Sequence, residues 1–313
     1  MNLKQIKFSL AVVINLLAAL TFGYFCFLGA NFFTLGDKGT SITVTAIITL
    51  LLIGTSLGAK FLKQTKRNFK SRFIWEIVLL VLFTLLTASF TYFPFSHYFS
   101  VSENETQIKS KLNSSIAQAG NMYVEYEKYV NNRKSNYKAN LESAILTMHA
   151  SNIDFKKYDF KTNSIAYDKQ IKRKMITIGF DLVPSSFIAM KDVNSKWLAD
   201  SKQLVNDWKP IGLVDVINNI DKNSNKWKAD LITISKTRET GEEKDAVDFT
   251  YSLPFNEVKN YFTSVGNPTP LSVIYAILLY VLMLLSWIFT KRDSKWPGLK
   301  VIFGYGESSE NEL

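Results

Sequence analysis

The chain contains very little cysteine and histidine, and this shortage excludes several kinds of site. Cys26 is its one cysteine, so no intramolecular disulfide can form. The two histidines, His97 and His149, stand far apart, and neither has Cys, Asp or Glu at the spacing of a metal site. We therefore expect no bound metal, and burial of a hydrophobic core must stabilise any domain that the chain forms.

Sequence motifs of common enzymes are missing as well. The chain has no Gly-rich phosphate loop, no Gly-x-Ser-x-Gly turn and no zinc-protease motif. The scattered aspartates at 154, 159, 168 and 181 are explained by solvation at the surface. The sequence therefore predicts no catalytic, cofactor-binding or metal-binding residue, and a protein that is not an enzyme.

Charge is missing from four long stretches, and each is apolar. These stretches cover residues 8–35, 40–59, 77–102 and 270–290. A helix of about 20 apolar residues crosses the ~30 Å of hydrocarbon in a bilayer. The sequence thus predicts three transmembrane helices within residues 1–94 and a fourth at 269–290. The first stretch is too long for a signal peptide and has no clear cleavage site, so we expect it to stay as an anchor.

The basic residues predict how the chain is oriented. Lys and Arg total 37 against 27 Asp and Glu, a net charge of +10, but the placement of basic residues beside the apolar stretches matters more: six lie in the short loop 60–72 and four in the tail 291–313. The loop between the first two stretches holds a single basic residue, Lys38, whose charge Asp37 offsets. Short basic loops stay in the cytoplasm, so we expect both termini inside and residues 95–268 outside. In a bacterium with two membranes, this is an inner-membrane protein with a periplasmic domain.

The same basic clusters bear on the partners of the chain. They determine topology and contact anionic lipid headgroups, so membrane lipid is an expected partner. A nucleic-acid site would need a basic folded surface with stacking aromatics, and only Phe61, Phe69 and Phe73 lie nearby. We expect no nucleic acid as a partner.

Residues at the ends of the apolar stretches are predicted to lie at the membrane interface. Tyr and Trp favour the headgroup level, where one part of the ring is apolar and the other can form hydrogen bonds. Glu76 follows Arg72 by four residues, which favours an ion pair on one helix face. In a second interpretation, Glu76 faces other spans and carries protons or orders assembly. The predicted interface residues are Arg72, Trp75, Glu76, Tyr92, Tyr98 and Trp287.

Residues 95–150 have the pattern of an external helical stalk. Apolar residues recur at spacings of three and four, and they form a seam that needs a partner, either from this chain or from another copy. The polar segment 131–136 leaves two forms open, one long helix or an antiparallel hairpin. We expect the hairpin, because Asn-rich segments commonly mark turns. The seam comprises Ile108, Leu112, Ile116, Tyr123, Tyr126 and Val130.

Residues 151–268 suggest a small α+β module. Apolar and polar residues alternate from Ile176 to Leu182, as in a half-buried strand. Further strands are predicted at 231–234 and 247–253, and helices at 193–208, 213–220 and 255–262. The expected fold is therefore an α-helical membrane protein with four transmembrane helices and an external α+β domain on a helical stalk.

This layout resembles the TssN family, the transmembrane component of type VI secretion systems in the Bacteroidota lineage. The resemblance lies in three clustered spans, an external domain at 95–268, one late span and a short basic tail. It implies a structural inner-membrane subunit of the trans-envelope complex that docks a contractile injection machine. The expected partners are other subunits of a secretion or envelope complex and further copies of the chain, in a homo-oligomer.

Two other functions are open. The chain is alternatively a sensory receptor with an external ligand-binding domain, but its tail 291–313 is too short for a signalling domain and would need a separate cytoplasmic partner. An envelope enzyme or transporter is the least favoured, because catalytic motifs are missing and the apolar stretches offer a solute few polar residues at mid-depth.

Overall fold

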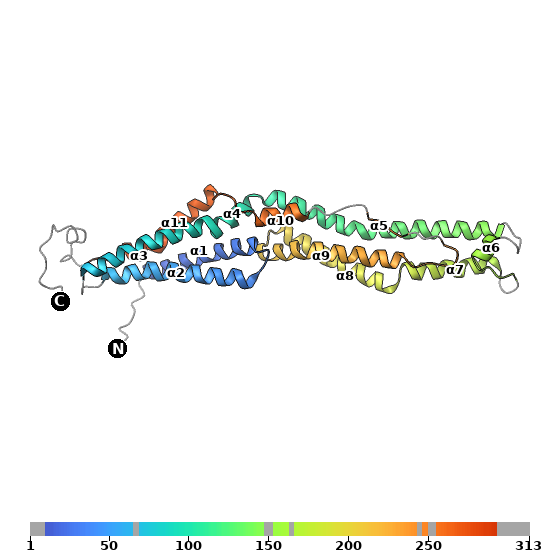
Figure 1. Cartoon of the computed structure of the whole chain (residues 1–313), viewed down its shortest axis with the longest axis horizontal. Coiled ribbons are helices and arrows are strands. Elements are labelled where there is room, and N and C mark those ends of the chain that lie inside the picture. Colours follow the sequence, from blue (N-terminus) through green and yellow to red (C-terminus); the bar gives the residue numbers. More distant parts are fainter. Residues whose placement is uncertain are drawn as a thin grey trace, which may run out of the picture. The chain divides into compact units, whose positions relative to one another are not determined.

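The computed structural model describes residues 10–64, 69–146, 153–162, 166–242, 246–249 and 255–292 (Figure 1). Every regular element within these ranges is a helix. The chain divides into two compact units. The membrane unit comprises Met1–Thr106 and Lys259–Leu313, and the helical unit comprises Gln107–Val258.

Four helical segments are long and apolar enough to cross a membrane. They are α1 (Leu10–Phe33), α2 (Lys38–Gln64), the segment Ser71–Glu103, and α11 (Pro270–Ile288). The third contains most of α3 (Phe69–Phe90), the π-helical turn η1 (Thr91–Phe95) and α4 (Ser96–Glu103). These helices lie where the uncharged stretches predicted transmembrane helices, and their length and composition indicate a multi-pass membrane protein.

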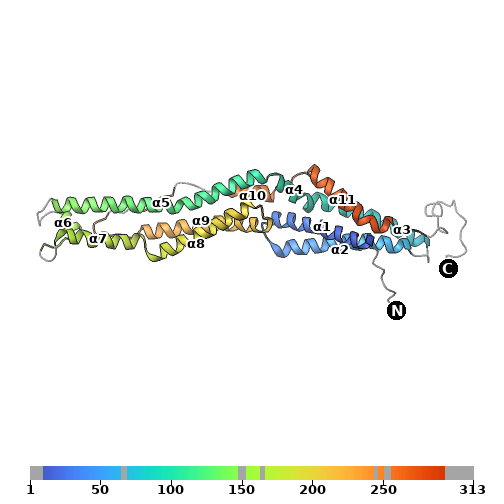
Figure 2. The same cartoon turned by 180° about the vertical axis from the view of Figure 1, so that it is seen from behind.

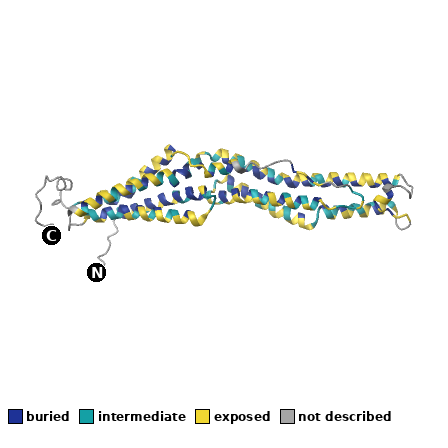
Figure 3. Ribbon diagram, viewed as in Figure 1, coloured by how far each residue is buried: buried dark blue, intermediate teal, exposed yellow. Residues whose placement is uncertain are grey.

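Apolar residues are found both inside and outside the membrane unit. Phe22, Leu52 and Met283 are buried where α1, α2 and α11 meet, whereas Leu50 and Ile274 are largely exposed. Figure 3 shows the buried residues on the faces that these helices turn toward one another. Apolar residues on the outward face suit a lipid surrounding, so this distribution agrees with membrane insertion.

Close approach of backbones shapes the third span. Pro94 has no N–H to donate, and Phe93 has non-helical dihedral angles (φ −156°, ψ 134°), so the helix is kinked at η1. A Cβ atom on Gly29 of α1 would lie 2.0 Å from the Pro94 carbonyl oxygen. Only glycine allows α1 to approach the kink this closely.

Capping residues define the starts of two spans. Asp37 accepts hydrogen bonds from the backbone N–H of Thr40 (3.1 Å) and from its hydroxyl (2.6 Å), and these bonds lower the pKa of the Asp37 carboxyl. Thr269 accepts from the Ser272 N–H at 3.2 Å, and Pro270 occupies the first turn of α11. Both helices therefore begin where local sequence satisfies free backbone donors.

The helical unit is built from α5 (Glu105–Leu146), α6 (Ile153–Lys157), α7 (Tyr167–Leu182), α8 (Ser185–Asn206), α9 (Pro210–Ser235) and α10 (Phe255–Thr263), of which α5 and α10 extend past its ends. Helices α8 and α9 pack side by side (Figure 2). The helices predicted at 193–208 and 255–262 are confirmed, and the one at 213–220 is part of the longer α9.

The predicted α+β domain is wrong, because the residues described by the structure contain no strand. The expected strand at 176–182 is the end of α7. Ile178 and Leu182, four residues apart, are buried, whereas Ile176 and Phe180, also four apart, are exposed. Two apolar stripes on opposite helix faces produced the alternation of a strand. Segment 231–234 is helical within α9, residues 247–249 are non-regular, and 250–253 lie outside the described residues.

The expected turn at 131–136 is also wrong, since α5 continues through it as one helix. Arg133 lies in this polar segment and is buried within the unit, so the segment contributes an inward-facing side chain instead of a turn. His149 and most of the tail 291–313 lie outside the described residues, as do residues 65–68 of the basic loop.

Candidate functional site in the membrane unit

Polar side chains join three helices at the basic end of the membrane unit. Glu76 of α3 is buried, accepts a hydrogen bond from Trp287 Nε1 at 2.9 Å and forms an ion pair with Arg292. Lys63 of α2 donates to the Trp287 carbonyl at 2.8 Å, and its Nζ lies 4.0 Å from the centroid of the Trp287 ring system. We call Lys63, Glu76, Trp287 and Arg292 the ion-pair cluster.

The ion-pair cluster differs from the pair that the sequence suggested. Among the described residues, Glu76 pairs with Arg292, which follows the fourth span, and not with Arg72 one turn earlier on its own helix. Glu76 therefore faces another span, as the second interpretation of this residue held. The sequence did contain one signal for this pair. Arg292 directly follows the fourth apolar stretch, and that end of the stretch is predicted to lie on the same side of the membrane as Glu76.

A second polar group lies between α1, α2 and α11. The Asn15 side-chain amide donates to the Met283 carbonyl and lies within hydrogen-bond distance of the hydroxyls of Ser56 (3.2 Å) and Ser286 (3.4 Å). A buried amide is costly in an apolar surrounding unless it is hydrogen-bonded, so these bonds favour one arrangement of the three helices. No motif in the sequence marks Asn15, although a polar residue within an apolar stretch is itself a signal.

The remaining predicted interface residues fall into two groups. Trp75 and Tyr92 are exposed on the outside of the membrane unit, where headgroup contact is available. Tyr98 instead packs in an aromatic cluster, with ring centroids 5.5 Å from Phe25 and 5.8 Å from Phe32. Tyr98 thus stabilises helix packing, and a position of the other two at the membrane interface stays a prediction.

The predicted seam of α5 is buried by the chain itself. All six of its residues are buried, and the Tyr126 hydroxyl donates to the Leu182 carbonyl of α7 at 2.8 Å. The Tyr123 hydroxyl accepts from Asn194 Nδ2 of α8 at 2.6 Å. Burial raises the pKa of Tyr123 to about 12, although the Asn194 hydrogen bond opposes the shift. The seam has its partner within the helical unit, so it does not itself require another copy.

The helical unit contains a buried ion pair that no sequence pattern predicted. Arg133 Nη2 lies 2.7 Å from Glu242 Oε2, and the two side chains are 6% and 7% exposed. The guanidinium also donates to the carbonyls of Ser235 and Thr237. Burial alone lowers the pKa of Arg133, but hydrogen bonds and the charge of Glu242 outweigh it and raise that pKa. The pair attaches the segment after α9 to α5.

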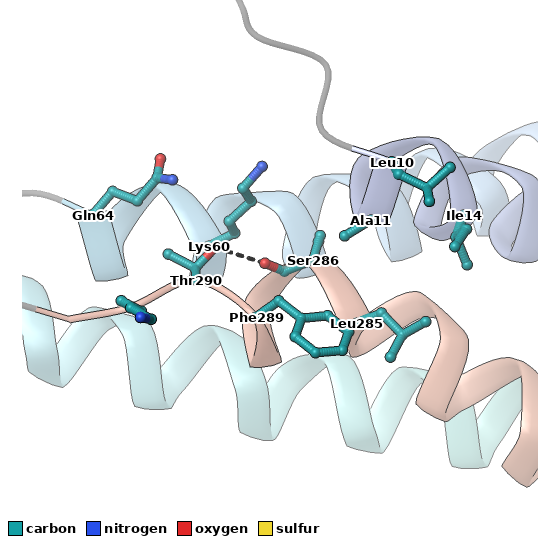
Figure 4. Close-up of a pocket in the computed structure, with 10 residues that line it drawn as sticks. Leu10, Ala11, Ile14, Lys60, Gln64, Leu285, Ser286, Phe289 and Thr290 are labelled. Carbon is teal, nitrogen blue, oxygen red and sulfur yellow. Dashed lines mark hydrogen bonds between the residues drawn. The ribbon is translucent and has the colours of Figure 1, made fainter.

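Two cavities lie among the membrane helices. One, of about 690 Å³, is bounded by α1, α2 and the end of α11 (Figure 4). Its lining combines two lysines, Lys60 and Lys291, with apolar residues. The other, of about 390 Å³, lies between α3 and α11 and is largely apolar. Among the described residues no three His, Cys, Asp or Glu side chains gather as a metal site would require.

The chemistry of these groups is that of helix positioning and anion binding. Among the residues that the structure describes, the buried charges of Glu76 and Arg133 are paired, whereas buried Lys60 at the larger cavity forms no ion pair. Comparison with protein-family models, with curated proteins and with solved structures found no match to this chain.

Proposed function

We propose that the chain is a structural subunit of a complex that bridges the cell envelope. Four helices anchor it in the inner membrane, both termini lie in the cytoplasm, and the helical unit contacts partner subunits in the periplasm. The basic loop and tail favour this orientation. The resemblance in layout to TssN makes a type VI secretion system the specific complex that we propose.

Exposed apolar side chains on α7 and α8 are the observation that supports this function best. Phe180 and Ile176 project from one face of α7, and Phe180 is 71% exposed. On α8, Val193 is 67% exposed and Ile188 is also exposed. None of the four candidate spans lies in the helical unit, so membrane crossing does not account for these residues. Large apolar side chains that lie exposed outside the membrane spans suit contact with a partner protein.

The opposite face of α7 strengthens this argument. Ile178 and Leu182 are buried within the helical unit, so α7 carries apolar residues on both faces. A helix with apolar residues on two faces is typical of a helix buried on both sides. One side is covered by this chain, and we propose that a partner subunit covers the other.

The interior polar groups also favour a scaffold over a transporter. Asn15 and the ion-pair cluster are hydrogen-bonded to neighbouring helices, so their polar atoms hold the spans together. A transporter needs polar groups that are available to a solute at mid-depth.

Site-specific photocrosslinking in native membranes tests the proposal. A photoreactive residue replaces Phe180 in the full-length chain, and the control replaces Lys138, an exposed polar residue on α5. We expect Phe180 to cross-link to another envelope protein and Lys138 to give far less product. Phe180→Ser should lower recovery of the complex about tenfold or more, because a Phe side chain contributes about 1.5–3 kcal/mol when buried.

The identity of the cross-linked protein separates the outcomes. A subunit of a contractile injection machine supports the secretion assignment, and an unrelated envelope protein supports only the scaffold. A chain that migrates alone, with no cross-link from Phe180, contradicts the proposal. A rise in melting temperature with a small ligand, in a chain without partners, would instead favour the sensory receptor.

A further inference from the structure

The larger cavity of the membrane unit combines a basic part with an apolar part. Lys60 and Gln64 of α2 extend in the same direction, one turn apart (Figure 4). Thr290 and Lys291 line the cavity after α11. The remaining lining residues are Leu10, Ala11 and Ile14 of α1 and Leu285, Ser286 and Phe289. The volume of about 690 Å³ lies within the usual range of ligand pockets.

Lys60 is the unusual residue of this cavity. The residue is only 8% exposed, and a lysine with so little exposure ordinarily has a carboxylate partner. Among the described residues, Lys60 forms no ion pair, and its Nζ lies 6.0 Å from the centroid of the Phe61 ring. Glu76 cannot neutralise it, because that carboxylate is already bound by Arg292 and Trp287. The cavity therefore holds a positive charge that an external anion can balance.

We propose that this cavity binds one anionic phospholipid of the surrounding bilayer. The phosphate lies against the ammonium groups of Lys60 and Lys291 and accepts a hydrogen bond from the Gln64 amide. Thr290 contributes no donor, because its hydroxyl already donates to the Ser286 carbonyl at 2.7 Å. Basic pockets between transmembrane helices are typical sites for acidic lipid headgroups.

The apolar wall selects a lipid over a free phosphate ion. Ile14, Leu285 and Phe289 would remain in contact with water if inorganic phosphate alone occupied the cavity. An acyl chain covers this wall and removes its apolar surface from water. The lipid would also join α1, α2 and α11 at their basic ends, so its binding should stabilise the membrane unit.

Native mass spectrometry of the full-length chain tests this assignment. The chain is released from nanodiscs of phosphatidylcholine that contain a minor fraction of phosphatidylglycerol. We expect one phosphatidylglycerol molecule to remain bound. Lys60→Gln should reduce its retention about fivefold, since one basic residue contributes about 1 kcal/mol toward an anionic lipid. Ala11→Phe should also reduce retention, because it fills the cavity and leaves every charge in place.

Arg72→Gln is the matched control, because it removes one positive charge near the same end without lining the cavity. We expect retention in this variant to equal that of the unmodified chain. Equal retention of phosphatidylcholine, equal loss in Arg72→Gln, or no loss in Lys60→Gln would overturn the proposal. Displacement of the lipid by inorganic phosphate or glycerol phosphate alone would assign the site to a free anion. Melting temperatures in pure phosphatidylcholine establish that each variant is folded.

Discussion

Individual buried charges in the helical unit are stabilised by partners from distant parts of the chain. Arg133 and Glu242 are 109 residues apart in sequence, yet their side chains form two hydrogen bonds of 2.9 and 2.7 Å. The guanidinium also donates to the carbonyl of Ser235, the last residue of α9, and to that of Thr237 after it. Breaking one side of such a pair leaves an uncompensated buried charge, which costs more than the pair itself contributes.

Arg133→Met should therefore destabilise the chain strongly. We expect the free energy of unfolding to fall by about 3–5 kcal/mol, because the buried Glu242 carboxylate loses its guanidinium partner. Lys138→Met is the control, since its pair with Glu142 is exposed and 3.6 Å long, and we expect a change below about 1 kcal/mol. Denaturant unfolding of the full-length chain in detergent, followed by helical circular dichroism, measures both. Equal effects of the two variants would contradict this role of Arg133.

Glu239 gives the helical unit a pH dependence of stability. Burial raises the pKa of Glu239, and the hydrogen bond and negative charge of Asp181 raise it further, with a contribution from Glu242. The folded chain then binds a proton at Glu239 more tightly than the unfolded chain does. Protonation favours the folded state, so this carboxyl reduces stability as the pH rises from the ordinary glutamate pKa through the raised value.

Glu239→Gln should remove this part of the pH dependence. We expect the melting temperature of the variant to decline less than that of the unmodified chain as the pH rises through this interval. Glu142→Gln, which removes an exposed carboxylate of α5, should keep the original slope. Thermal unfolding at a series of pH values provides the comparison. A slope in Glu239→Gln identical to that of the unmodified chain would show that the raised pKa does not affect stability.

At the scale of elements, the sequence predicted helices best where one property persists over many residues. The expected spans 8–35 and 270–290 match Leu10–Phe33 and Pro270–Ile288 closely, because an uncharged stretch of this length has few alternatives. The expected strand at 176–182 failed because apolar side chains on both faces of α7 imitate an alternating pattern. The ion pair Arg133–Glu242 could not be predicted either, because it joins distant segments without a local pattern, and for Glu76–Arg292 the one signal was the position of Arg292 directly after the fourth stretch.

The continuity of α5 is testable with proline. Asn132 lies in the polar segment where a turn was expected, and it is exposed on α5. Asn132→Pro should reduce the free energy of unfolding by about 3 kcal/mol or more, because proline removes a helical hydrogen bond and clashes with the preceding turn. Asn132→Ala should be neutral or slightly stabilising. A hairpin turn would tolerate the proline, so equal stability of the two variants would contradict one continuous helix.

Close packing of α1 against η1 gives a second prediction at this scale. A Cβ on Gly29 would meet the Pro94 carbonyl oxygen at 2.0 Å, whereas a Cβ on Gly54 of α2 would meet no atom within 4 Å. Gly29→Ala should lower the free energy of unfolding by about 1–3 kcal/mol through overpacking. Gly54→Ala should be neutral or stabilise the chain by up to about 1 kcal/mol. Thermal unfolding in detergent compares the two, and an unaffected Gly29→Ala would contradict this packing.

For the whole molecule, the account depends on where the two units stand relative to the lipid. Four spans anchor the membrane unit, and the helical unit occupies the sequence between the third and fourth. The basic residues of 60–72 and 291–313 predict one side of the membrane for both of these segments. A scaffold of the envelope requires the helical unit on the other side, where α7 and α8 can meet partners.

Cysteine labelling in intact cells measures this arrangement most directly. In a Cys26→Ser background, single cysteines replace exposed Lys222 of α9 and exposed Gln64 at the end of α2. A maleimide that enters the periplasm but does not cross the inner membrane should label the Lys222→Cys chain in intact cells, and the Gln64→Cys chain only after lysis. Labelling of Gln64→Cys in intact cells, with protection of Lys222→Cys until lysis, would place the helical unit in the cytoplasm and contradict the envelope-bridging role.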